Sequence, residues 1–103
     1  MRHLPHMTAL RAFEAAARLA SFSKAAAELN VTPAAISQQI RGLEAYFGLA
    51  LFIRSTRHLE LTPAGQAALP FLSEGLDRLA EGVQAIQREQ EGGMLTISVT
   101  PSF

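Results

Sequence analysis

Residues 33–46 are predicted to form a helix whose two faces differ in chemistry. Thr32 is a suitable N-cap, and Pro33 can occupy the first helical position, where its missing N–H costs nothing. The apolar face is Ile36, Ile40, Leu43 and Phe47, and the opposite face is Ala34, Ser37, Gln38 and Arg41. Hydroxyl, amide and guanidinium groups can bind base edges and phosphates, so the pattern favours a helix that enters the DNA major groove. The alternative is an ordinary surface helix, and the neighbouring segments decide between the two.

The segment before this helix predicts a second, shorter helix and a tight corner. Ser23 can cap a helix over residues 24–29, in which three consecutive alanines leave room for another helix to approach closely. Asn30 tolerates the left-handed conformation with which many helices end. Because only Val31 then precedes the next N-cap, the two helices must meet at a steep angle, which is helix-turn-helix geometry. Generic helical hairpins also use short turns, but the polarised second helix favours DNA binding.

The composition limits the class of protein. With 103 residues, of which 49% are hydrophobic, the chain can form one small packed domain and an additional element. It contains no cysteine, which excludes disulfides, thiolate zinc sites and cysteine nucleophiles. The first ten residues lack the apolar run of a signal peptide, and no stretch reaches the length of a membrane span. We therefore expect a soluble, cytoplasmic protein with no membrane partner.

The formal net charge is zero, but the charges are unevenly distributed. Residues 1–65 carry seven basic residues against four glutamates, a charge of +3, whereas residues 66–103 carry two arginines against five acids, a charge of −3. The basic residues of the first part are Arg2, Arg11, Arg18, Lys24, Arg41, Arg54 and Arg57. Positive charge around the helix-turn-helix pattern favours binding to phosphates. Because the surplus is modest, we expect specific binding to need two protomers.

A first helix is predicted from residue 8 to about residue 20. One side of it is apolar, and we interpret that side as core that packs beneath the helix-turn-helix. Phe22 lies just before the predicted Ser23 cap and is expected to fix the angle at which the chain enters the next helix. The apolar side of the first helix consists of Met7, Leu10, Phe13 and Ala17.

Two short strand-like runs follow Gly48, which ends the pattern of the second helix-turn-helix element. Residues 51–53 and 59–61 are predicted to pair as a two-stranded ribbon with a basic tip. Such a ribbon beside a helix-turn-helix is typical of a wing, and Arg54 and Arg57 are expected to reach phosphates or the minor groove. A solvated charged loop is the alternative, and the adjacent helix favours the wing.

The most regular periodicity lies in a long helix predicted from Pro63 towards Gln90, with Thr62 as its N-cap. Its apolar residues are spaced alternately three and four apart, which gives a narrow heptad seam suited to a partner helix. We therefore predict a homodimer formed through this helix; a helix that lies over its own domain is the alternative. Pro70 is expected to bend the first turns. The seam consists of Leu69, Leu72, Leu76, Leu79, Val83 and Ile86.

The expected organisation is mainly α and has three parts. Residues 1–62 form a winged helix-turn-helix with a two-stranded wing, and residues 63–91 form a long coiled-coil linker and dimerisation helix. Gly92 and Gly93 are predicted to end that helix, and the alternating pattern that follows resembles a strand with no sheet to join. Residues 92–103 are therefore expected to be a hinge and the first strand of a truncated effector-binding domain.

The motifs SFSKAAAELNVT, PAAISQQIRGLE, FGLALFIRSTR and LTPAG occur in this order. With them, residues 7–65 resemble the amino-terminal DNA-binding domain of LysR-type transcriptional regulators, and within that family the glycine-cleavage-activator-like subgroup. The helix from Pro63 resembles the family's linker helix. The closing MLTISVTPSF is similar to the first strand of the family's effector-sensing domain, whose fold is like that of periplasmic binding proteins. Family members are much longer, so the chain is similar to a fragment that lacks nearly all of the sensor.

The resemblance implies a set of DNA contacts. In the family, the start of the recognition helix and its Ser touch the operator, the residues beside them lie near the sugar-phosphate strand, and a wing arginine enters the minor groove. Gln38 stands where Arg is frequent; Arg there favours guanine, whereas Gln is suited to a bidentate pair with adenine. The expected DNA-binding residues are Ser23, Lys24, Thr32, Pro33, Ala34, Ser37, Gln38, Gln39, Arg41, Arg54 and Arg57.

The resemblance also implies partners. It predicts double-stranded DNA with a pseudo-palindromic operator, a homodimer through the linker helix, a tetramer of the full-length protein and contact with RNA polymerase. No cofactor is expected in this fragment, whereas a small-molecule co-inducer is expected for the full-length protein. Thr100 and Ser102 resemble positions near the effector-binding cleft of the family.

Enzymatic alternatives have little support from the residues. His3 and His6 lie three apart and His58 lies elsewhere, without carboxylates or cysteines clustered near them, so we expect no metal site. Asp77 is the only aspartate, and no turn motif supports a Ser-His-Asp arrangement. The remaining alternative is a dimeric winged-helix protein–protein interaction module without DNA specificity. The clustered basic residues favour DNA.

Overall fold

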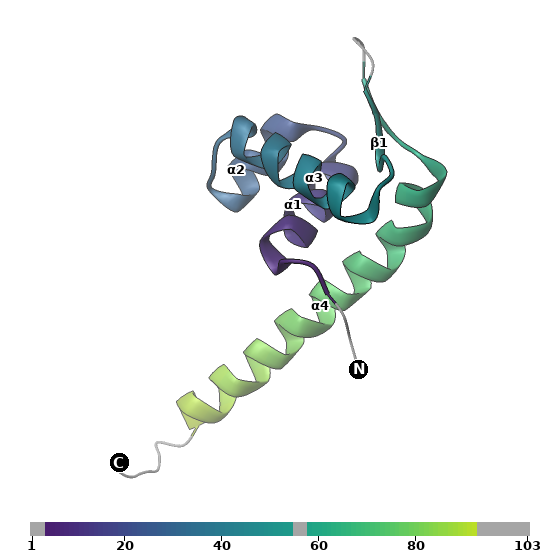
Figure 1. Cartoon of the computed structure of the whole chain (residues 1–103). Helices are drawn as coiled ribbons and strands as arrows, with labels where there is room; N and C mark the ends of the chain where they lie inside the picture. The colour runs from purple at the N-terminus through teal and green to yellow at the C-terminus, as the bar shows by residue number, and fades with distance from the viewer. Residues whose placement is uncertain (1–3, 55–57, 93–103) are drawn as a thin grey trace. The chain divides into compact units, whose positions relative to one another are not determined.

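The computed structural model describes residues 4–54 and 58–92, within which the chain forms four helices and a two-stranded sheet (Figure 1). In chain order these elements are α1 (Met7–Leu19), α2 (Phe22–Leu29), α3 (Pro33–Phe47), β1 (Phe52–Arg54), β2 (Leu59–Leu61) and α4 (Pro63–Gly92). Three short helices followed by a ribbon and a long helix confirm the predicted winged helix-turn-helix. The chain divides into two compact units between Ser73 and Glu74, inside α4.

The junction between α1 and α2 differs from the prediction. Ala20 adopts a left-handed backbone (φ 53°) and ends α1, and the extended Ser21 accepts a hydrogen bond at Oγ from the Lys24 N–H at 3.1 Å. Ser21 is therefore the N-cap of α2. The prediction that Ser23 fills this role is wrong, because the chain has already entered the helix at Phe22. Phe22 is accordingly the first residue of α2 rather than the residue before its cap.

The corner between α2 and α3 agrees with the prediction. Asn30 has a left-handed backbone (φ 61°), and the single residue Val31 leads from it to Thr32. The Thr32 hydroxyl accepts a hydrogen bond from the Ala35 N–H at 3.1 Å, and Pro33 is the first residue of α3. Helices α2 and α3 each contact α1 and contact one another, which leaves one side of α3 at the surface (Figure 1).

The core of the first unit lies where α1 meets α2 and α3. Phe13, Ile36 and Ile40 are its largest fully buried side chains. Two residues predicted to lie on core-facing sides are instead exposed, Met7 by 42% and Phe47 by 49%. Met7 is the first residue of α1 and Phe47 is the last residue of α3, so fewer neighbours cover them at the helix ends. Buried alanines let the helix backbones approach closely; they are Ala9, Ala12, Ala15, Ala16, Ala25 and Ala26.

Strands β1 and β2 form the predicted antiparallel ribbon, in which Phe52 lies opposite Leu61. Residues 55–57, which include the predicted tip of the wing, lie outside the described residues. At the base of the ribbon, the buried Phe52 ring lies 5.5 Å from the Phe13 ring and 5.8 Å from the Phe22 ring, measured between centroids. Aromatic contacts therefore anchor the base of the wing to α1 and α2.

Helix α4 begins at Pro63, as predicted, and continues through Pro70 to Gly92. The Thr62 hydroxyl accepts a hydrogen bond from the Gly65 N–H at 3.2 Å and donates one to the Ala50 carbonyl at 2.8 Å. The predicted strand from residue 94 lies outside the described residues. Four residues in the first turns of α4 are partly buried against the core; they are Ala64, Ala68, Leu69 and Leu72.

A glycine in the first turn of α4 marks a close approach of two backbones. A Cβ on Gly65 would lie 2.5 Å from the Leu51 carbonyl oxygen, which already accepts the Thr62 N–H at 3.0 Å.

Gly65→Ala is therefore expected to lower the free energy of unfolding by about 1–3 kcal/mol, because this backbone cannot withdraw without disturbing the base of the wing. Urea unfolding measures the change. Gly42→Ala in α3 is the control: nothing lies within 4 Å of its added Cβ, so it should stabilise the helix by up to about 1 kcal/mol. Equal effects of the two substitutions would contradict the steric argument.

Candidate nucleic-acid interface

The outer side of α3 exposes the side chains that the sequence pattern selects. They lie opposite the buried Ile36, Ile40 and Leu43, so the helix has one packed face and one solvent face. The solvent face presents amide and guanidinium groups together with small residues that let another molecule approach the helix. Its exposed residues are Thr32, Pro33, Ala34, Gln38 and Arg41, with Ser37 half-buried among them.

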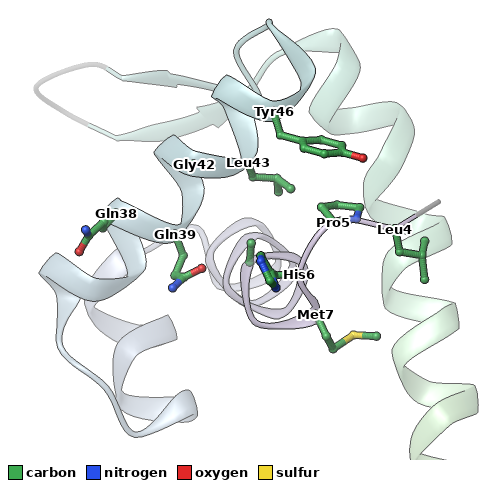
Figure 2. Close-up of a pocket in the computed structure, with 10 residues that line it drawn as sticks. Leu4, Pro5, His6, Met7, Gln38, Gln39, Gly42, Leu43 and Tyr46 are labelled. Atoms are coloured by element: carbon green, nitrogen blue, oxygen red, sulfur yellow. The ribbon is translucent and has the colours of Figure 1, made fainter.

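Two neighbouring glutamines of α3 have different surroundings. A pocket of about 730 Å³ lies between α3 and the segment that leads into α1. Both glutamines line this pocket, but Figure 2 shows the Gln39 side chain directed towards Pro5 and His6 and the end of the Gln38 amide directed away from them. Gln39 is half-buried and Gln38 is exposed. Gln38 is therefore the better placed of the two for contact with a base.

The start of α2 adds a cation and a hydroxyl close to α3 in the fold. Ser23 and Lys24 are both exposed in the first turn of α2, which packs against α3. Within residues 4–54 and 58–92, no ion pair involves Lys24 or Arg41. These two cations can therefore bind phosphates without first breaking a bridge to a described carboxylate.

Arg54 lies in β1 rather than in the turn where the sequence pattern predicts it. One of its terminal nitrogens is 3.4 Å from Glu44 Oε1, and its Cζ is 5.9 Å from the centroid of the Phe22 ring. These contacts hold the guanidinium against the base of the ribbon, so contact between Arg54 and DNA stays a prediction. Arg57, the predicted minor-groove residue, lies outside the described residues, as do Thr100 and Ser102.

A polar network that the sequence analysis missed joins three helices of the first unit. The carboxylate of Glu14, which is buried in α1, accepts hydrogen bonds from Arg18 Nε at 2.9 Å and from the Ser73 hydroxyl of α4 at 2.7 Å. Arg18 also pairs with Glu28 of α2. Arg18 therefore adds little to the positive charge available for DNA, since two carboxylates neutralise it. The spacing of Glu14 and Arg18 could have indicated an i,i+4 pair, but Ser73 lies 59 residues away.

The network makes folding stability depend on pH. Burial by itself raises the pKa of Glu14, but the hydrogen bonds from Arg18 and Ser73 and the charge of Arg18 outweigh it, so its pKa lies below the ordinary 4.5. A carboxyl with a depressed folded-state pKa stabilises the fold above its unfolded-state pKa and loses that contribution as the pH falls through the folded-state value.

Glu14→Gln is therefore expected to be less stable than the wild type at neutral pH. Its stability should also fall less steeply below pH 4.5. Urea unfolding across that acidic range measures the slope. Glu81→Gln, at an exposed carboxylate of α4, is the control for the loss of one negative charge. A Glu14→Gln profile parallel to the wild-type profile would rule out this source of pH dependence.

Membrane spans and metal sites are two further features that the described part of the chain bears on. Among those residues, no helix is long and apolar enough to cross a membrane. No group of three or more His, Cys, Asp or Glu side chains there could hold a metal ion. His3 lies outside that part of the chain.

The sequence matches known regulators over most of its length. Residues 7–66 match the model of the bacterial regulatory helix-turn-helix protein family, lysR family. The chain is 48% identical over 102 residues to the HTH-type transcriptional activator AmpR of Providencia stuartii, and 46% identical over 102 residues to the glycine cleavage system transcriptional activator of Escherichia coli K12. Each alignment covers 99% of the chain, but only 35% and 33% of the respective relatives, so the chain spans about a third of their length.

Solved structures agree with the sequence match. The crystal structure of the BenM_DBD/catB site 1 DNA complex aligns with a TM-score of 0.76 at 30% identity, over 85% of this chain and 98% of that one. The CbnR_DBD–DNA complex aligns with a TM-score of 0.69 at 33% identity, over 85% of this chain and 100% of that one. The helix-turn-helix, the wing and the long helix are thus shared with proteins related in sequence. The chain belongs to the lysR family of bacterial regulatory helix-turn-helix proteins.

Proposed function

We propose that this chain is the DNA-binding and dimerising part of a transcriptional regulator that binds double-stranded DNA in a sequence-specific manner. The observation that carries the proposal is α3: one face is buried in the core, and the opposite face exposes Gln38 and Arg41 with Ser37 among them. Amide and hydroxyl groups can read base edges in the major groove, and a guanidinium can bind the neighbouring phosphates.

Related proteins support this proposal. BenM and CbnR DNA-binding domains similar to this chain have been solved as complexes with DNA, and the relatives from Providencia stuartii and Escherichia coli are named transcriptional activators. Ser37 and Gln38 are the proposed base-reading residues. Lys24 and Arg41 are proposed to bind phosphates, with the wing arginines in or near the minor groove.

A homodimer through α4 is the second part of the proposal. In the second unit, the apolar side chains of Leu79, Val83 and Ile86 are 54–70% exposed. An apolar row of this spacing suits a partner helix, and two protomers would place two copies of α3 on successive major grooves of a pseudo-palindromic site. Leu69 and Leu72, at the start of the predicted seam, also pack against the core of their own unit.

The whole protein is proposed to be a cytoplasmic regulator without catalytic activity. In this proposal residues 1–62 bind DNA, residues 63–91 dimerise, and residues 92–103 lead into an effector-sensing domain. That domain would bind a small-molecule co-inducer, with Thr100 and Ser102 near its cleft, and would assemble a tetramer that contacts RNA polymerase. These assignments extend the family membership to parts of the protein beyond this chain.

A titration of duplex DNA at several salt concentrations tests the proposal against a protein-interaction module of the same fold. Contacts to several phosphates release counterions, so the logarithm of the association constant should fall linearly with the logarithm of the salt concentration. Affinity that does not depend on ionic strength would reject DNA binding. Selection of bound duplexes from a random pool then supplies the preferred site.

Gln38→Ala is expected to reduce discrimination between the selected site and sites mutated at the contacted base pair by about 1–3 kcal/mol. The reason is that Gln38 is exposed on the solvent face of α3, whereas Gln39 is half-buried. Competition binding with matched and mutated duplexes measures the effect. Gln39→Ala is the control and should leave discrimination closer to that of the wild type. Equal losses on selected and random DNA would contradict a base-reading role for Gln38.

A further inference from the structure

The carboxyl end of α3 is joined to the wing through one residue, Glu44. Its main-chain carbonyl accepts hydrogen bonds from the Gly48 N–H at 2.8 Å and the Leu49 N–H at 3.2 Å, which closes the end of the helix. Its carboxylate oxygen Oε2 accepts the Leu51 N–H at 2.8 Å and the Phe52 N–H at 3.3 Å. Glu44 therefore binds the turn that ends the recognition helix and also the start of the first wing strand.

The other carboxylate oxygen extends this connection along β1. Oε1 of Glu44 is 3.4 Å from a terminal nitrogen of Arg54, the last residue of that strand. The Arg54 guanidinium also lies over the Phe22 ring of α2. The Glu44 side chain is only 16% exposed, whereas the Arg54 side chain is 40% exposed, so water competes less for the carboxylate than for the guanidinium. One carboxylate thus contacts both ends of β1.

The hydrogen-bond donors and acceptors around Glu44 are partners of one another. Leu51 and Phe52 are 6% and 5% exposed, and buried N–H groups are destabilising when they lack an acceptor. A largely buried carboxylate in turn needs several donors, and two N–H groups and a guanidinium provide them. Thr62 contacts the same loop from its other side, through its hydroxyl to the Ala50 carbonyl and its N–H to the Leu51 carbonyl.

We propose that Glu44 is a positioning residue that sets the placement of the wing relative to the base-reading face of α3. Gln38 and Glu44 are six residues apart on one helix, so about 9 Å of rigid helix separates them along the axis. A strand bound to Glu44 is therefore held at a fixed distance from Gln38. The inference rests on the proposed DNA-binding function. In it, Glu44 sets the distance between the DNA contact of α3 and the DNA contact of the wing, although Glu44 itself does not touch DNA.

Three substitutions of Glu44 in the 103-residue chain separate the effect of its side-chain length from the effect of its charge. Glu44→Gln keeps an oxygen that can accept the Leu51 and Phe52 N–H groups but removes the charge that faces Arg54. Glu44→Asp keeps the charge but withdraws the carboxylate by one methylene, beyond hydrogen-bond reach of those N–H groups, and Glu44→Ala removes both. Glu60→Gln is the matched control: it changes the net charge by the same amount as Glu44→Gln, at an exposed carboxylate of β2 that contacts His58.

The first measurement is made on the free protein. Residual dipolar couplings of backbone amides report the orientation of β1 and β2 relative to α3. In Glu44→Asp and Glu44→Ala, the couplings of amides in α1, α2 and α3 should fit the wild-type structure. The couplings of amides in the wing should not fit it. Glu44→Gln and Glu60→Gln should retain the wild-type orientation. If the wing keeps its wild-type orientation in Glu44→Asp, the proposal is wrong. Glu44→Asp tests the proposal even if Glu44→Ala fails to fold.

The second measurement uses the duplex that the wild-type chain selects from a random pool. Glu44→Asp should bind that duplex about tenfold more weakly and lose backbone protection at the flanks of the hydroxyl-radical footprint, while protection at the base pairs read by Gln38 persists. Glu44→Gln should lose no more than about threefold. A displaced wing with an unchanged footprint would overturn the role in DNA recognition. If the wild-type chain shows no salt-dependent binding, the proposed function fails, and the couplings still decide whether Glu44 places the wing.

Discussion

Leu79→Asp is expected to convert the proposed homodimer to monomers, with a sedimenting mass near the 11.1 kDa of one chain. Leu79 is 55% exposed in the second unit and lies in the row that continues through Val83 and Ile86. In the proposed dimer this row is covered by a partner helix, and a carboxylate placed there would be buried without a cation to compensate it. Loss of the dimer should weaken binding to a two-half-site duplex by about 100-fold, because the second half-site no longer contributes to avidity.

The control places the same charge on another side of the same helix. Gln84 is exposed and lies outside the apolar row, so Gln84→Asp should leave both the sedimenting mass and the affinity close to those of the wild type. Sedimentation equilibrium over a range of protein concentrations separates a weakened dimer from an absent one. If Leu79→Asp still sediments as a dimer, the apolar row is not the seam.

Phe13→Ala is expected to cause the largest loss of stability in the first unit, about 3–5 kcal/mol. The Phe13 side chain is fully buried, and its ring lies 5.5 Å from the ring of Phe52 at the base of the wing. Removing the ring leaves a cavity beneath the helix-turn-helix and also removes the aromatic contact that anchors the wing. Because small domains are stable by only about 5–15 kcal/mol, a substantial fraction of the molecules should unfold near physiological temperature.

Phe71→Ala is the matched control, since the same atoms are removed from a side chain that is 77% exposed. Its effect should stay within about 0.5 kcal/mol of the wild type. Urea unfolding followed by circular dichroism gives both values under one set of conditions. Similar costs for the two phenylalanines would mean that the packing of Phe13 does not determine the stability of the unit.

Helix α3 could be predicted closely because its signals are local. Thr32 caps it, Pro33 starts it, Gly48 ends it, and the spacing of Ile36 and Ile40 distinguishes its buried face from its exposed face. Each of these signals acts within a few residues, so no knowledge of the remaining chain is needed. The wing strands and the start of α4 were predicted for the same reason.

The sequence-based predictions fail at positions where two local structures are both compatible with the residues. Ser21 and Ser23 are both suitable N-caps, and the choice between them depends on the left-handed Ala20, which has no sequence signal as strong as glycine. Met7 and Phe47 have the correct helical spacing for the core, but periodicity does not say how far a neighbouring helix extends over each end. Leu69 and Leu72 have the spacing of the proposed dimer seam, yet they also pack on their own core.

The sequence by itself determined the helices, the wing, the polar face of α3 and the apolar row of α4, because each depends on residues within one or two helical turns. Only the tertiary structure decided which partners the charged residues have. Arg18 is neutralised by Glu14 and Glu28, Arg54 is held by Glu44, and Ser73 reaches Glu14 across 59 residues. Apart from the i,i+4 pair of Glu14 and Arg18, these contacts form only when folding brings distant segments within hydrogen-bond distance, and the spacing of residues along the chain does not encode that distance.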